Sequence, residues 1–75
     1  MYWKNKPELS SCVAEARKVA KLTQAELALK CSVTRQTIIA IEKGNYIPSV
    51  ALALELAKAL QTSVEKLFMI RGDTA

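Results

Sequence analysis

The stretch TQAELALKCSVTRQTIIAIEKG, from Thr23 to Gly44, decides the fold of this chain. Thr23 and Thr34 are good N-caps, and Glu26 stands three residues after Thr23, which completes a capping box. The sequence therefore predicts two short helices joined by a tight turn, a helix-turn-helix over residues 23–43. The apolar residues after each cap recur at helical spacing, so each helix has one face to bury. They are Leu27, Ala28, Cys31, Val33, Ile38 and Ile41, with Val33 in the turn.

The opposite face of the second helix carries no acidic residue. By helical spacing it presents Arg35, Gln36, Ile39, Ala40 and Lys43. Arginine and glutamine bond bidentately to base edges in the major groove, and a helix N-terminus favours phosphate. This pattern indicates a helix that reads DNA. An ordinary helical hairpin with a solvated polar face has the same spacing, so spacing alone does not separate the two interpretations.

The positive charge of the chain favours the nucleic-acid interpretation. The chain has 11 basic and 7 acidic residues, a net charge of +4. Six of the bases but only two of the acids lie between residues 17 and 43, so this segment holds the whole excess. A local positive field of this kind suits a polyanion.

Length and composition predict one small all-α domain over residues 1–75. The chain is 51% apolar and has only two glycines and two prolines, so its core must be packed efficiently or shared with a partner chain. Cys12 and Cys31 are not spaced as a CxxC pair, and there is no histidine, so we expect reduced thiols and no metal site. A disulfide between the two cysteines is the alternative.

Several classes of protein are excluded by what the sequence lacks. It has no apolar run long enough to span a membrane and no signal peptide, so we expect a cytoplasmic protein with no membrane contact. It has no paired carboxylates on one face and no glycine-rich phosphate loop, so we expect neither an enzyme nor a cofactor.

Caps and spacing outside the central stretch predict three further helices. Ser10 or Ser11 caps a first helix that runs to about Lys21, and Ser49 and Ser63 cap a fourth and a fifth. The expected inward positions of the first helix are Val13, Ala16 and Val19 or Ala20, and those of the fifth are Val64, Leu67 and Phe68. The fourth helix, Val50 to Leu60, is mostly Ala and Leu, so we expect burial nearly all round, within the core or against a second subunit.

The two ends of the chain contain strand-like segments. Phe68 to Arg71 has strand character, and Tyr2 and Trp3 are the apolar residues of the N-terminal segment. A short ribbon between them, within or between subunits, would cover both, whereas the alternative is two loose tails.

With all five helices placed, the chain resembles the phage repressor/Cro type of helix-turn-helix regulators, also called the xenobiotic response element family. The matching phrases are LTQAELA, SVTRQTI, IEKGNYIPS and LALELAKAL, and the resemblance covers about Val13 to Phe68. It implies a five-helix repressor-like bundle that binds double-stranded operator DNA as a homodimer and represses transcription. Ser32 departs from the family pattern, which usually has glycine in the turn.

The resemblance and the side-chain chemistry together assign residues to DNA. The expected base-reading residues are Arg35, Gln36, Ile39 and Ala40. The expected contacts to the DNA backbone are Arg17, Gln24, Thr34, Thr37, Lys43, Asn45 and Tyr46. The resemblance also implies that Arg17 and Glu42 form a pair that ties the first helix to the end of the reading helix. The alternative function is an antitoxin-like module that holds a protein partner and also binds DNA, which the apolar fourth helix and the Phe68–Ile70 segment favour.

Overall fold

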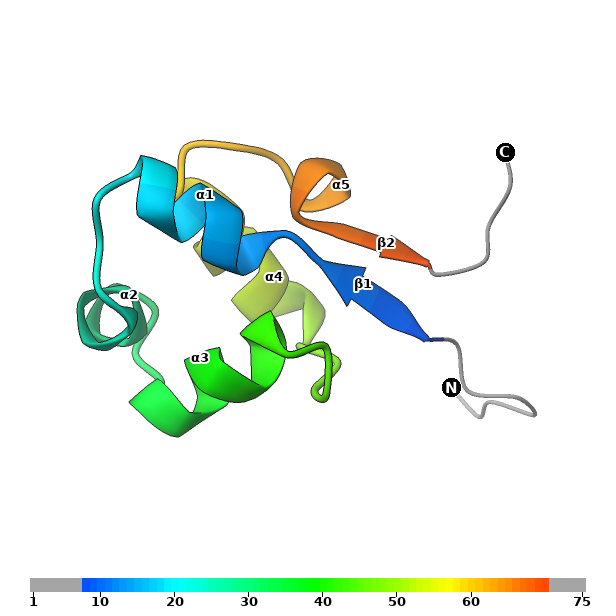
Figure 1. Ribbon diagram of the computed structural model, residues 1–75, viewed down its shortest axis with the longest axis horizontal. Coiled ribbons are helices and arrows are strands. Elements are labelled where there is room, and N and C mark those ends of the chain that lie inside the picture. The colour runs from blue at the N-terminus through cyan, green and yellow to red at the C-terminus, as the bar shows by residue number, and fades with distance from the viewer. Residues whose placement is uncertain (1–7, 71–75) are drawn as a thin grey trace.

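The computed structural model describes residues 8–70, which form a helical bundle with a small ribbon at one end (Figure 1). Within these residues there are five helices and one two-stranded antiparallel sheet. In chain order the elements are β1 (Leu9–Ser11), α1 (Val13–Val19), α2 (Gln24–Lys30), α3 (Arg35–Glu42), α4 (Val50–Ala59), α5 (Val64–Leu67) and β2 (Phe68–Ile70). The predicted five-helix bundle with a short ribbon is therefore confirmed.

The helix-turn-helix begins where the caps predict. The Thr23 hydroxyl accepts a hydrogen bond from the Glu26 amide at 3.0 Å, and the Glu26 carboxylate accepts one from the Thr23 amide at 2.8 Å. The hydroxyls of Thr34, Ser49 and Ser63 cap α3, α4 and α5 in the same way. In Figure 1, α2 is seen end-on while α3 runs across the view, so the two helices cross at a steep angle.

The first helix is shorter than the sequence predicts. Ser10 and Ser11 lie in β1, and α1 begins at Val13 after Cys12, although the Ser11 hydroxyl still accepts the Val13 amide at 3.3 Å. The predicted inward place of Val19 or Ala20 is wrong, because both side chains are exposed, Val19 by 81%. Val19 lies six residues after the buried Val13, about 120° round the helix from it, and α1 has already ended at Ala20.

The core is built from one side of each helix. Its buried apolar residues are Val13, Leu27, Ala28, Cys31, Ile38, Ile41, Ala53, Leu56, Ala57, Leu60 and Leu67. Val33 packs against them from the turn between α2 and α3, as predicted. Cys12 and Cys31 are free thiols, and burial raises the pKa of the Cys31 thiol, as does the charge of Glu55.

The fourth helix is not buried all round within one chain. Its residues Ala53, Leu56 and Ala57 face the core, whereas Val50 is 77% and Leu54 57% exposed. A helix at the side of a bundle presents only one face to it, so the opposite apolar face of α4 has no cover from the described residues of its own chain.

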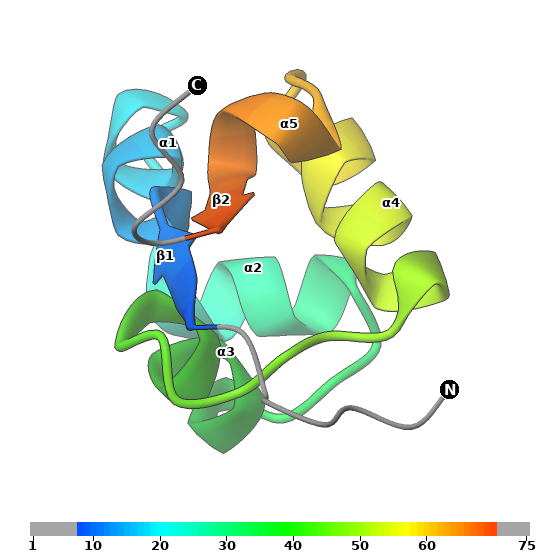
Figure 2. The same ribbon diagram turned by 90° about the vertical axis from the view of Figure 1, so that its right-hand side faces the viewer.

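The turns that frame α3 depend on left-handed backbone. Ser32, between α2 and α3, has φ +57°, the conformation in which glycine is usual. Gly44 follows α3 with φ +77°, and the Asn45 amide returns to the Ala40 carbonyl at 2.9 Å. A Cβ on Gly44 would lie 3.1 Å from the Leu9 carbonyl, so β1 runs against the loop that follows α3 (Figure 2).

The ribbon joins β2 to a different segment from the one expected. Leu9, Ser10 and Ser11 pair with Ile70, Met69 and Phe68, in that order. Tyr2 and Trp3, the expected partners of the C-terminal strand, lie outside the described residues. Among residues 8–70 no helix combines the length and the apolar character needed to cross a membrane.

Candidate nucleic-acid interface

One face of helix α3 packs into the core, and the opposite face is accessible to solvent. Ile38 and Ile41 are completely buried and fix α3 against α1 and α2. On the outer side, Arg35 and Gln36 are exposed in the first turn, and Ile39 and Ala40 are half-buried. Figure 1 shows α3 along the lower edge of the bundle. The expected base-reading residues therefore share one accessible surface.

The start of α3 is organised by two threonines. The Thr34 hydroxyl accepts a hydrogen bond from the Thr37 amide at 3.2 Å and lies 3.1 Å from the Thr37 hydroxyl. Thr34 is the N-cap of α3 and Thr37 lies in its first turn, so both hydroxyls stand at the positive end of the helix. This end of α3 suits an anion.

The loop after α3 places a second group of expected contacts. Lys43, Asn45 and Tyr46 are exposed, and the Gly44 amide bonds to the Ile41 carbonyl at 3.0 Å. The loop is thus closed onto the last turn of α3, and its exposed side chains continue from the end of that helix.

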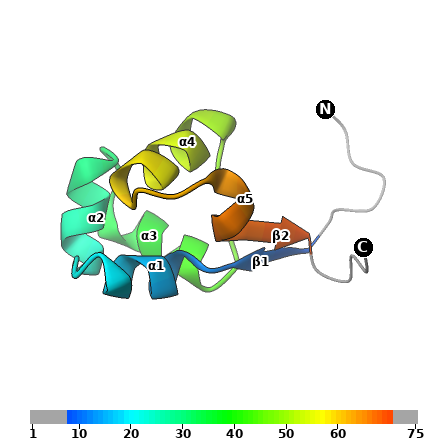
Figure 3. The ribbon, with the colours of Figure 1, turned by 90° about the horizontal axis from the view of Figure 1, so that it is seen from above.

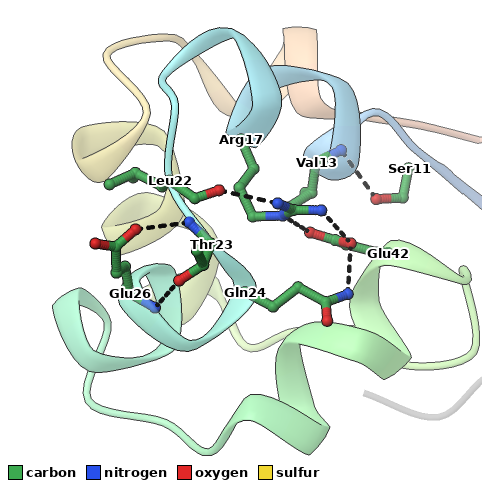
Figure 4. A network of polar contacts seen from close by, with 8 residues as sticks. All are labelled: Ser11, Val13, Arg17, Leu22, Thr23, Gln24, Glu26 and Glu42. Atoms are coloured by element: carbon green, nitrogen blue, oxygen red, sulfur yellow. Dashed lines mark hydrogen bonds and ion pairs between the residues drawn. The ribbon is translucent and has the colours of Figure 1, made fainter.

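Arg17, Gln24 and Glu42 form one network between three helices (Figure 4). Arg17 Nε donates to Glu42 Oε2 at 2.6 Å, and Arg17 Nη2 donates to Glu42 Oε1 at 3.3 Å. The Gln24 amide Nε2 donates to the same Oε1 at 3.0 Å, and Arg17 Nη1 donates to the Leu22 carbonyl at 2.9 Å. The expected Arg17–Glu42 pair is present, and its side chains are only 13% and 8% exposed.

The network favours the ionised form of Glu42. Burial of its carboxyl disfavours ionisation, but the hydrogen bonds from Arg17 and Gln24 and the charges of Arg17 and Lys18 outweigh burial. Together they hold the pKa of Glu42 below its ordinary value. Two of the expected backbone contacts, Arg17 and Gln24, are thus bound to protein groups, a role of Gln24 that the sequence did not reveal.

This geometry agrees with comparisons to known proteins. Residues 13–67 match the family described as Helix-turn-helix. This chain belongs to that helix-turn-helix family. A relative named as an uncharacterised HTH-type transcriptional regulator of Methanothermobacter thermautotrophicus is 47% identical over 68 residues, which cover 89% of this chain and 99% of that protein. The uncharacterised HTH-type transcriptional regulator YgzD of Bacillus subtilis is 43% identical over 61 residues, 81% of this chain and 92% of that protein.

A solved structure supports the fold. The restriction-modification controller protein C.AhdI from Aeromonas hydrophila superimposes with a TM-score of 0.67 and 28% identity, over 72% of this chain and 82% of that protein. The resemblance drawn from the sequence phrases is confirmed at the level of a family of helix-turn-helix transcriptional regulators. Among residues 8–70, no group of three or more His, Cys, Asp or Glu side chains is placed to hold a metal ion.

Proposed function

We propose that this protein binds double-stranded DNA sequence-specifically, as a homodimer, and represses transcription from its operator. The observation that carries the proposal is the outer face of α3, on which Arg35 and Gln36 stand exposed while Ile38 and Ile41 fix the helix from behind. No acidic residue stands in the first turn of α3, so nothing there repels phosphate. A helix presented in this way fits the major groove.

Base reading belongs to the first half of that face. Arg35 can donate two bonds to guanine O6 and N7, and Gln36 can bond adenine N6 and N7. Ile39 and Ala40 lie closer to the bundle, where an apolar side chain meets a thymine methyl group. The four residues together specify a short half-site.

Backbone contacts would surround the reading face. Thr34 and Thr37 stand at the N-terminus of α3, and Lys43, Asn45 and Tyr46 stand in the loop after it. A Gln24 Nε2 group has two hydrogens, and the Glu42 bond uses one, so the other remains for a phosphate. Arg17 likewise has more N–H groups than its three bonds use. Glu42 would then orient both residues toward the backbone.

A homodimer follows from the spacing of DNA. One protomer carries one reading helix, and two such helices bind half-sites about 34 Å apart on one face of the duplex. Repression requires only that the dimer occupy an operator that overlaps a promoter. Two surfaces offer exposed apolar residues for subunit contact: Val50 and Leu54 of α4, and Met69 and Ile70 of β2.

The same exposed residues favour a second candidate, an antitoxin-like module that holds a protein partner and also binds DNA. Val50 and Leu54 alone do not distinguish a second copy from a different protein. Tight binding to the selected duplex without any added protein favours the first candidate, whereas binding that appears only when a protein partner is added favours the second.

The experiment is selection of binding sites from random duplex DNA by the purified protein, followed by titration of the selected duplex and a scrambled duplex at several salt concentrations. We expect the protein to bind the selected duplex at least about 10³-fold more tightly than the scrambled duplex. The logarithm of the association constant should fall linearly with the logarithm of the salt concentration. Equal affinity for the selected and scrambled duplexes at every salt concentration would rule out sequence-specific binding.

A further inference from the structure

The ribbon has an outer strand edge without a partner among the described residues. The Cys12 amide donates to the Leu67 carbonyl at 2.7 Å, which makes these two residues a hydrogen-bonded pair at the base of the ribbon. Hydrogen-bonded and non-hydrogen-bonded pairs alternate along an antiparallel ladder, so Ser10 and Met69 form the next hydrogen-bonded pair. The backbone groups of Ile70 and the Phe68 carbonyl therefore point away from β1.

That edge is apolar as well as unpaired. The strand β2 reads Phe-Met-Ile and contains no charge. Met69 is 58% and Ile70 54% exposed, whereas Phe68 packs partly against the core. Natural proteins usually protect such edges with charge, proline or a covering element, and an unprotected edge is a template for another strand. The ribbon also extends away from the helices, as the view from above shows (Figure 3).

We infer that β2 of a second copy pairs with β2 across this edge, about a two-fold axis at Met69. Antiparallel pairing about Met69 places Phe68 opposite the partner's Ile70, and each Ile70 amide donates to the partner's Phe68 carbonyl. The Phe68 amide takes no part, because it already bonds to the Val64 carbonyl. The two ribbons become one four-stranded sheet, and the two-fold axis closes the assembly as a dimer.

Side chains match across the same axis. Successive residues of a strand point to opposite faces, so Phe68 and Ile70 share one face and Met69 lies on the other. Pairing about Met69 therefore covers the half-buried Phe68 with the partner's exposed Ile70, and it brings the two Met69 side chains together. No like charges meet, because β2 has none.

The position of the ribbon suits the proposed function, on which this inference rests. The molecule measures 35 × 23 × 18 Å, and the ribbon lies at one end of its longest axis (Figure 1). Protomers joined end to end through the ribbon place their α3 helices on opposite sides of the axis, as two reading helices at separate half-sites require.

Disulfide trapping tests the axis directly and needs no DNA. Two Met69 residues would form a non-hydrogen-bonded pair with Cα atoms about 4.5 Å apart, within the range that a disulfide spans. We compare Met69→Cys with Ser10→Cys, both in a Cys12→Ser background. Ser10 lies on the same face but one strand further from the axis, so it is the matched control. Under mild oxidation, Met69→Cys should yield mainly covalent dimers and Ser10→Cys none above background; equal or absent cross-linking overturns the inference.

A second pair of variants tests the hydrogen bonds. Ile70→Pro removes the outward amide without touching the Ser10–Met69 pair, and Ile70→Val keeps that amide. By sedimentation equilibrium without DNA, Ile70→Pro should raise the dimer dissociation constant at least about tenfold, and Ile70→Val should leave it unchanged. Circular dichroism should show the same helix content in both.

The rival surface is α4, which Leu54→Asp would disrupt. If Leu54→Asp separates the dimer and Ile70→Pro does not, the subunits meet through α4 and the ribbon pairing is wrong. A dimer that depends on Ile70 but shows no preference for any duplex would contradict the proposed function and leave the ribbon pairing standing.

Discussion

Arg17 Nε lies 2.6 Å from Oε2 of Glu42, and this ion pair ties α1 to the last turn of α3. The second carboxylate oxygen of Glu42 accepts Gln24 from the start of α2. Three helices thus meet at one carboxylate, so the orientation of α3 depends on it. Glu42 therefore positions α3, the helix that we propose reads DNA, and need not touch DNA itself.

Removing that carboxylate should weaken both the fold and DNA binding. Glu42→Ala leaves the Arg17 guanidinium largely buried without its counter-charge, and it frees the Gln24 amide. We expect the free energy of unfolding to fall by about 1–3 kcal/mol and the affinity for the selected duplex to fall with it. Thermal unfolding and DNA titration measure the two effects. Glu15→Ala, on the exposed side of α1, is the control, and a Glu42 variant that behaves like it would contradict this role.

The same group predicts how stability depends on pH. The pKa of Glu42 is lowered in the folded protein, so the unfolded chain binds its proton more readily. The stabilising contribution of Glu42 is fully present above the unfolded pKa of about 4.3, and it disappears as pH falls through the lower folded pKa. Between pH 7 and pH 3, the melting temperature should therefore fall more steeply in the wild type than in Glu42→Gln. Parallel curves for the two proteins would show that Glu42 contributes nothing to the slope.

Ser32 offers a stabilising substitution. It adopts φ +57°, where a side chain costs about 1 kcal/mol relative to glycine. It is exposed, so removing the hydroxymethyl group loses little packing. Ser32→Gly should raise the melting temperature by about 4–8 °C for a domain of this size. Thr34→Gly changes a neighbouring residue with extended backbone and removes a cap, so it should lower the melting temperature.

Local signals in the sequence predicted most of the fold. The caps at Thr23, Thr34, Ser49 and Ser63 and the buried faces of α2 and α3 follow from short-range patterns, which helices obey closely. The first helix was misplaced because Ser10 and Ser11 suit a cap as well as a strand, and only pairing with β2 decides between them. The exposure of Val50 and Leu54 likewise depends on which elements pack against α4.

The sequence likewise predicted part of the candidate site but not all of its contacts. Helical spacing places Arg35 and Gln36 on the exposed face, and the family resemblance supplied the Arg17–Glu42 pair. The bond from Gln24 to Glu42 was not expected, because the residues are 18 positions apart and their contact depends on the crossing of α2 and α3. No periodicity within one helix encodes such a contact.

The central claim is that Arg35 reads a base whereas Lys43 holds the DNA backbone, and one titration tests it most directly. Arg35→Ala and Lys43→Ala are titrated against the selected operator and its single-base variants at several salt concentrations. Arg35→Ala should lose about 1–3 kcal/mol of discrimination at one base pair, whereas Lys43→Ala should weaken all sites alike and reduce the salt slope by about one unit per protomer. If Arg35→Ala instead loses affinity evenly across all the sites, Arg35 is a phosphate contact and α3 does not read DNA through it.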